Sequence, residues 1–126
     1  MKLKVHHQLL AMGLSPNELK VYCYLMSCAT DGIAIVRAGR IAERCQISRA
    51  TVQTACSSMA AKGVLSKVKR YADGHLIANA YHLSTFTGRF FMLDADAAVF
   101  GLSGSVFTTY LASVSYTHLR AHETRS

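Results

Sequence analysis

The sequence predicts a mainly α-helical domain with a small β-hairpin, which is an α+β fold. Three observations favour it: an N-capped segment with helical apolar spacing, two short helical segments separated by a two-residue turn, and two apolar runs joined by Asp73-Gly74. Of the 126 residues, 51% are apolar and 17% are charged, which is enough apolar material for one core. We therefore predict a folded domain over residues 1–89.

The first predicted helix runs from Pro16 to Ala29. Ser15 is a suitable N-cap, proline suits the first helical position, and Glu18 completes a capping box. Lys20 is expected to be an exposed charge on this helix. Asp31-Gly32 ends the helix, and Ile33–Val36 is a short β-branched run that predicts a strand. The apolar positions expected in the core are Leu19, Tyr22, Cys23 and Met26, with Leu25 and Ala29 alongside.

Residues 38–62 predict a helix-turn-helix. Gln46-Ile47 forms the turn with Ile47 anchored in the core, Ser48 caps the second helix, and Gly63 ends it. Two runs follow, 64–71 and 76–83, which form a β-hairpin because Asp73-Gly74 supplies the positive φ of a tight turn. The residues expected to point inward from the two helices are Ile41, Ala42, Cys45, Val52, Ala55, Cys56, Met59 and Ala60.

Positive charge is concentrated in the first part of the chain. Residues 1–89 hold twelve Lys and Arg against four Asp and Glu, a net of 12 − 4 = +8, whereas residues 90–126 hold two against three, a net of −1. Such a distribution favours a polyanionic partner. Because many soluble proteins are basic without binding nucleic acid, charge alone does not decide this.

The order of helix, short strand, helix-turn-helix and hairpin over residues 14–83 resembles a winged helix-turn-helix domain. More narrowly, residues 13–22 (GLSPNELKVY) and 47–52 (ISRATV) are similar to winged-helix proteins of bacterial plasmids and phages. Many of those proteins are replication initiators or regulators. One departure is Gln46, where the turn more often carries Gly, so that some backbone strain is expected there.

The resemblance implies that a recognition helix, about residues 48–62, enters the major groove of double-stranded DNA. On its outward face Arg49 suits a bidentate contact to guanine and Gln53 one to adenine. Residues 48–61 contain no acid, as a surface that meets phosphates requires. The predicted base-reading residues are Arg49, Ala50, Gln53, Thr54 and Ser57.

The hairpin, about residues 64–83, is then the wing, which meets the adjacent minor groove or phosphates. The role of Arg40 and Arg44 is left open between DNA contact and solubility. One recognition helix reads few base pairs, so a homodimer or a tandem second winged helix is an expected partner. The predicted phosphate or wing contacts are Arg37, Ser48, Lys62, Lys67, Lys69, Arg70 and His75.

An internal repeat supports the tandem arrangement. A shift of 88 residues aligns Leu3–Tyr22 with Phe91–Tyr110 without a gap and matches Gly13-Leu14-Ser15 to Gly101-Leu102-Ser103. We interpret residues 90–113 as the truncated start of a second winged helix, with chance similarity of two helix starts as the alternative. Either interpretation makes them a helix-rich extension that docks on the first domain or stays loose.

The C-terminal residues differ in origin from the rest. Residues 114–124 (VSYTHLRAHET) resemble one translated frame of the transposase mosaic-end adapter used in sequencing libraries. We therefore expect residues 114–126 to be adapter-derived and the native sequence to differ after about Ser113. For this reason His118 and His122, at helical metal-ligand spacing, are not taken as a metal site.

Other classes of function are not favoured. Cys45 or Cys56 could be paired with His82 as nucleophile and base, but both cysteines fall on inward helix faces, and no phosphate-binding Gly-rich loop is present. The four cysteines lack metal spacing and are typical of a reducing compartment, while the uncharged residues 97–119 are too polar for a membrane span. We expect a cytoplasmic protein with no catalytic residue, metal or cofactor. The alternative function is a protein interaction module of a replication complex, with the basic surface facing an acidic partner.

Overall fold

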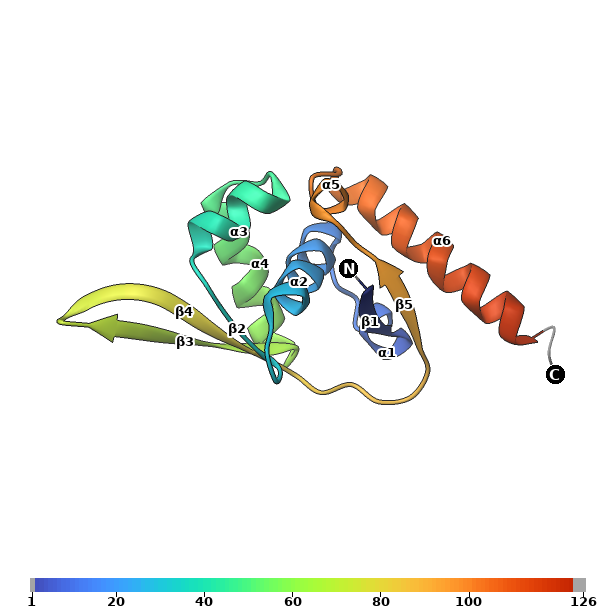
Figure 1. Cartoon of the computed structure of the whole chain (residues 1–126), viewed down its shortest axis with the longest axis horizontal. Coiled ribbons are helices and arrows are strands. Elements are labelled where there is room, and N and C mark those ends of the chain that lie inside the picture. Colours follow the sequence, from blue (N-terminus) through green and yellow to red (C-terminus); the bar gives the residue numbers. More distant parts are fainter. Residues whose placement is uncertain (1, 124–126) are drawn as a thin grey trace.

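The computed structural model describes residues 2–123, including their side chains except those of residues 76, 97, 98 and 117–123. Helix α2 lies between two groups of elements, with α3, α4 and the β3–β4 hairpin on one side and β1, β5 and α6 on the other (Figure 1). The elements are β1 (Lys2–His6), α1 (His7–Leu10), α2 (Pro16–Cys28), β2 (Ile33–Val36), α3 (Ala38–Cys45), α4 (Arg49–Ala61), β3 (Leu65–Ala72), β4 (His75–Leu83), β5 (Phe90–Asp94), α5 (Ala97–Phe100) and α6 (Gly104–Glu123).

Helix α2 is the centre of the core. It begins as predicted, since the Ser15 hydroxyl accepts a hydrogen bond from the Glu18 amide at 3.2 Å, and it ends at Cys28, with Ala29 as its C-cap. The carboxylate of Glu18 bonds to α4 instead, where it accepts from the Ser58 hydroxyl and the Lys62 ammonium, both at 3.2 Å. All residues from Glu18 to Leu25 are buried, because other elements pack around this helix on every side.

The prediction that Lys20 is an exposed charge is wrong. Its side chain is only 2% exposed, and its ammonium donates a hydrogen bond to the carbonyl oxygen of Leu102 at 2.8 Å. Burial lowers the pKa of Lys20, because the charged form loses solvation. The acceptor lies in the turn before α6, far along the chain, and the apolar periodicity around Lys20 contains no sign of it.

Helices α3 and α4 form the predicted helix-turn-helix. Gln46 adopts the left-handed conformation, with φ 54° and ψ 49°, and the amide of Ile47 donates to the carbonyl of Ala42 at 3.0 Å. The Ser48 hydroxyl then caps α4 by accepting from the Thr51 amide at 3.1 Å. The strained position predicted at Gln46 is thus present, and the hydrogen bond from Ile47 back to Ala42 closes the C-terminal end of α3.

The inward residues predicted for α3 and α4 are buried with one exception. Ala60 is exposed. The chain turns at Gly63, which has a φ of +75°, and the amide of Val64 donates to the carbonyl of Met59 at 2.9 Å. Val64, which is fully buried, thus follows Met59 into the core, whereas Ala60 does not.

Strands β2, β4 and β3 form an antiparallel sheet in that order, and β3–β4 is the predicted hairpin. Asp73 and Gly74 both have positive φ, 53° and 79°, as the tight turn requires. The register pairs Ala72 with His75 near the turn but Lys69 with Asn79 farther down, so a β-bulge lies between Lys69 and Tyr71. The strands begin and end within one residue of the predicted runs.

Residues 90–116 dock on the first part of the chain and share its core. Strand β5 pairs antiparallel with β1, and both strands alternate buried and exposed residues. The segment therefore begins with a strand, although we expected an extension rich in helix. Of the two alternatives, docking on the first domain or staying loose, the structure shows docking. Its large, fully buried side chains are Phe91, Leu93, Phe107 and Leu111.

The 88-residue repeat reappears in the structure. The shift takes β1 onto β5 (2 + 88 = 90 to 6 + 88 = 94) and the first residue of α2, Pro16, onto the first residue of α6, Gly104. Equivalent residues also meet: Lys4 pairs with Met92, and a Cβ built on Gly104 would lie 3.0 Å from the Cβ of Pro16. The two β–α–α segments thus share their order of elements, and their strands and second helices meet at equivalent positions.

Helix α6 continues into the adapter-like residues and ends at Glu123. Ser115, in that segment, is buried and forms a hydrogen bond of 3.1 Å with Nδ1 of His7. The side chains of His118 and His122 lie outside the described residues. Within the part of the chain that the structure describes, no helix combines the length and the apolar character that crossing a membrane requires.

Candidate nucleic-acid interface

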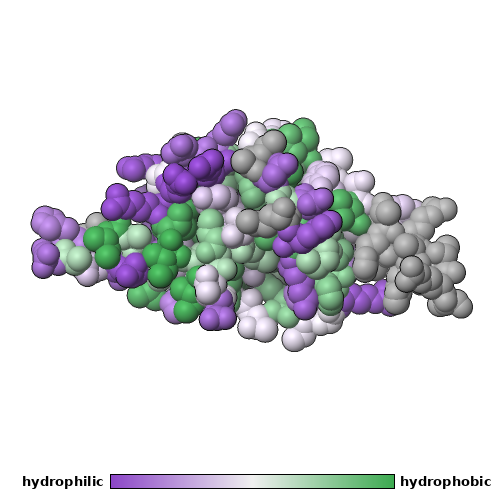
Figure 2. All heavy atoms as spheres, viewed as in Figure 1, coloured by the Kyte–Doolittle hydropathy of each residue, from purple (hydrophilic) through white to green (hydrophobic). Residues whose placement is uncertain are grey.

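The outward face of α4 is open. The helix packs on the core through its four buried residues, Val52, Ala55, Cys56 and Met59, and its opposite side is left free of protein. Helix α6 lies on the other side of α2 and does not cover this face (Figure 1). Hydrophilic residues gather over the α3 and α4 region and at the end of the hairpin (Figure 2). The predicted base-reading residues are all exposed: Arg49, Ala50, Gln53, Thr54 and Ser57.

A cavity of about 400 Å³ lies where the beginnings of α3 and α4 meet β4. Arg49 enters it from α4 and does not extend away from the protein, because its guanidinium lies against the backbone of Gly39. A Cβ built on Gly39 would lie 2.5 Å from Nη2 and 3.0 Å from Nε of Arg49. The other polar residues that line this cavity are Arg37, Gln53 and Asn79.

The hairpin adds positive charge beside α4. Lys67 pairs with Tyr81 and Lys69 with Asn79, and Tyr81 is 1% exposed beneath the helices. Cross-strand partners share a face of the sheet, so both lysines lie on the face toward α4. Arg70 falls within the bulge, and His75 is exposed at the tip.

Two of the predicted phosphate contacts already have partners within the protein. The Lys62 ammonium forms an ion pair with Glu18 at 3.2 Å and donates to the carbonyl of Gly13 at 3.2 Å, so it joins α4 to α2. The Ser48 hydroxyl caps α4 and also forms a 2.8 Å hydrogen bond with the Thr51 hydroxyl. The remaining predicted contacts, Arg37, Lys67, Lys69, Arg70 and His75, are exposed.

Arg40 and Arg44, whose role the sequence left open, lie on the opposite side of α3. They line a cavity of about 350 Å³ with Tyr24, Asp96 and Phe100, at the junction with the β5–α5 segment. Burial is the main cause that raises the pKa of Tyr24, while Arg40 acts in the other direction. These two arginines therefore lie beside the docked C-terminal segment, away from Arg37 and Arg49.

The cysteine thiols are not poised as nucleophiles. Cys45 and Cys56 are buried, and burial raises the pKa of Cys45 to about 12 and also raises that of Cys56. A thiol that holds its proton so firmly is a poor nucleophile at neutral pH. Among the described residues, no group of His, Cys, Asp and Glu has the arrangement of a metal site.

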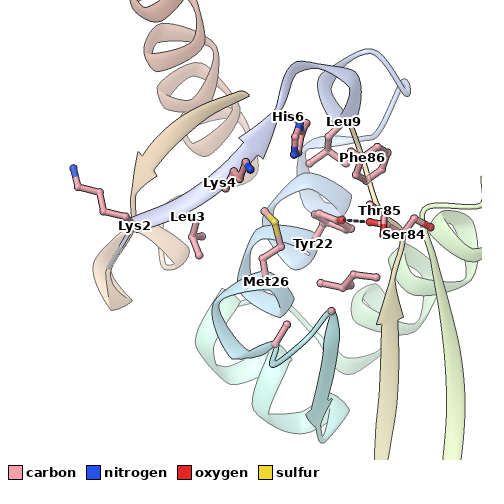
Figure 3. Close-up of a pocket in the computed structure, with 13 residues that line it drawn as sticks. Lys2, Leu3, Lys4, His6, Leu9, Tyr22, Met26, Ser84, Thr85 and Phe86 are labelled. Carbon is pink, nitrogen blue, oxygen red and sulfur yellow. Dashed lines mark hydrogen bonds between the residues drawn. The ribbon is translucent and has the colours of Figure 1, made fainter. Parts of the chain in front are cut away.

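A further cavity, of about 450 Å³, lies between β1, α2 and residues 83–86 (Figure 3). Tyr22 donates to the carbonyl oxygen of Ser84 at 3.5 Å across it, and burial raises the pKa of Tyr22 to about 12. Its walls are mainly apolar, with Leu3, Met26 and Phe86 among them. No residue of α3 or α4 lines this cavity, so it is separate from the open face of α4.

Two residues at the interface, Gly39 and Asn79, were missed by the sequence prediction. Asn79 donates to the Tyr81 hydroxyl at 3.3 Å, and its Oδ1 is buried without a hydrogen-bond partner in the structure. Extending the hairpin register from Asp73-Gly74 without a bulge would pair Lys69 with Ala78. The bulge shifts this pairing by one residue and thereby turns Asn79 toward the cavity.

Comparison with known proteins agrees with this geometry. Residues 12–65 match the model of a family described as a helix-turn-helix domain. No curated protein and no solved structure matches the chain. The matched residues run from the loop before α2 to the first residue of β3, so they include the complete α3–turn–α4 unit. Residues 12–65 are thus supported as a helix-turn-helix domain of the DNA-binding type.

Proposed function

We propose that this protein binds double-stranded DNA in a sequence-specific manner. Helix α4 lies in the major groove, and the β3–β4 hairpin acts as a wing on the adjacent minor groove or phosphates. The observation that carries the proposal is the open face of α4, which has no acid between residues 48 and 61 and has Lys67 and Lys69 beside it. A face of this kind meets a polyanion without repulsion.

Within this proposal, the α4 residues divide by chemistry. Gln53 offers a bidentate contact to adenine, Thr54 and Ser57 reach base edges or phosphates, and Ala50 contacts a thymine methyl. Arg49 lies at the start of the same face, where its sequence position predicts a contact to guanine. The phosphate contacts come from Arg37, Lys67, Lys69, Arg70 and His75, with Ser48 at the helix start. We leave out Lys62, since its ion pair with Glu18 already uses it.

The process that this binding serves follows from the family resemblance. We propose replication initiation or transcriptional regulation of a plasmid or phage. The shared element order of β1–α1–α2 and β5–α5–α6 supports a tandem arrangement, in which the second segment begins another winged helix. A homodimer is the other way to supply a second recognition helix.

Fluorescence anisotropy of the full chain with random and selected DNA duplexes, at several salt concentrations, tests the proposal. Neutralising about five phosphates gives a slope of log K against log salt of roughly −4 to −5. A selected duplex is expected to bind more tightly than random duplexes at every salt concentration. Affinity that ignores salt, or capture of an acidic protein by a chain without duplex affinity, would instead favour the protein interaction module.

A further inference from the structure

Two arginines from different elements converge on the cavity between α3, α4 and β4. Arg37 is the N-cap residue of α3, and Arg49 is the first residue of α4. Neither Asp nor Glu is among the residues that line this cavity. Two guanidinium groups at one cavity repel each other, and an anion between them converts that repulsion into attraction.

Gly39 determines where the Arg49 side chain lies. The guanidinium rests on the α3 backbone at Gly39, and a Cβ there would be 3.2 Å from Cζ and closer still to Nη2. Gly39 has ordinary helical backbone, which alanine adopts more readily than glycine does. The absence of a side chain therefore does not serve the helix. It leaves the space that Arg49 occupies.

We infer that Arg37 and Arg49 hold one backbone phosphate of the bound DNA, and that Gly39 is the positioning residue for Arg49. This inference rests on the proposed function and changes one part of it, because Arg49 becomes a phosphate contact where its sequence position predicted a base reader. A base reader extends from α4 into the groove, whereas this guanidinium is held against α3 and directed to the same cavity as Arg37. Gln53, at the rim of that cavity, keeps its contact to a base.

Three variants of the full chain test the inference: Gly39→Ala, Arg49→Ala and Arg37→Ala, with Arg40→Ala as the control. Arg40 lies on α3 but lines the cavity on its other side. Arg49→Ala is expected to weaken selected and random duplexes equally, by about tenfold, and to make the salt slope shallower by about 0.9. Gly39→Ala should weaken them in the same uniform way, with a urea unfolding midpoint no lower than that of the unmodified chain. The double variant Gly39→Ala/Arg49→Ala should lose no more affinity than Arg49→Ala alone.

Several outcomes would overturn the inference that Arg37 and Arg49 share one phosphate. A change of preference at one base pair in Arg49→Ala, with the salt slope intact, would restore Arg49 as a base reader. Full duplex affinity in Gly39→Ala would remove Gly39 from the mechanism. Saturable binding of inorganic phosphate that Arg49→Ala abolishes, without any change in duplex binding, would assign the cavity to a free anion. The unmodified chain tests the proposed function separately. If it binds no duplex, the proposed function fails and the inference with it, whereas duplex binding that Gly39→Ala and Arg49→Ala leave intact overturns the inference alone.

Discussion

Helices α2 and α4 are alike in length and in the way they begin, yet they have different surroundings. Each has 13 residues, and in each a serine N-cap accepts from the amide three residues on, at 3.2 Å for Ser15 and 3.1 Å for Ser48. Eight residues of α2 are buried, against four of α4. The local signals that start a helix therefore do not decide its role.

The difference lies in what packs against each helix. α2 contacts the helix-turn-helix on one side and α6 with β1 on the other, so that even Glu18 and Lys20 are enclosed and bonded. α4 contacts protein on one side only, and its other side carries polar residues without acids. An unopposed face of this kind is available to a ligand. The predictions below test this difference between the enclosed helix α2 and the open helix α4.

The largest expected difference is in stability. Leu25 of α2 is fully buried, and Leu25→Ala should lower the free energy of unfolding by about 2–5 kcal/mol through lost contacts and a cavity. Thr54→Ala on the open face of α4 should change it by no more than about 0.5 kcal/mol. Urea unfolding followed by circular dichroism measures both. A loss in Thr54→Ala as large as that in Leu25→Ala would mean that the α4 face is packed against protein.

Binding should respond in the opposite way. Gln53→Ala is expected to weaken the selected duplex by about 1–3 kcal/mol while leaving stability unchanged, because the side chain is exposed and makes a base contact only in the complex. Anisotropy titrations with duplexes varied at single positions give the measurement. Thr109→Ala, on the exposed face of α6, is the control and should bind as the unmodified chain does. Equal losses of affinity from both variants would contradict the proposal that DNA contacts the open face of α4.

The two N-caps should behave alike. Ser15→Ala and Ser48→Ala are each expected to cost about 1 kcal/mol of stability, since each leaves one helix-start amide without its acceptor. Thermal or urea unfolding provides the comparison, with Ser15→Asp and Ser48→Asp as variants that retain an acceptor. If only Ser15→Ala destabilised the chain, α4 would depend on tertiary contacts more than its exposure indicates.

The last prediction concerns alkaline pH. Burial raises the pKa of Cys23 on α2 to about 12 from an ordinary 9.0, so the folded state keeps a proton that the unfolded chain releases. Stability should therefore be constant below pH 9 and fall as the pH rises toward 12. Cys23→Ala should make that fall shallower, whereas Thr109→Ala, which removes no titratable group, should leave it unchanged. Urea unfolding at pH 8, 9 and 10 measures the fall in stability. Identical profiles for the unmodified chain and Cys23→Ala would contradict the assignment of this fall to Cys23.

Most of residues 14–83 could be predicted because the signals there are local. Ser15 with Pro16, Ser48, Gly63 and Asp73-Gly74 start or end elements through their own backbone and capping chemistry, and the structure has helices and strands at these places. The exposed side of α4 followed from the same periodicity that identified its buried side. That periodicity predicted one residue too many, Ala60, since it carries no information on where the chain folds back.

Long-range partners could not be predicted. Strand β1 was not predicted, because its partner strand lies some 88 residues away and neither segment alone identifies the other. Lys20 is buried for the same reason, because Leu102 supplies the acceptor. At the candidate site, the position of Arg49 depends on Gly39 from another helix, and that of Asn79 depends on a bulge. These contacts form only when distant parts of the chain come together on folding.

The length of the β3–β4 hairpin has a consequence for footprinting. Strand β3 has eight residues, and at roughly 3.3 Å per residue it extends about 26 Å from its base to its tip. Along a duplex that rises by about 3.4 Å per base pair, this corresponds to roughly eight base pairs. In the proposed complex, nuclease protection by one molecule should therefore reach well beyond the groove proposed for α4, and shortening the β3–β4 hairpin should retract only one boundary of the protected region.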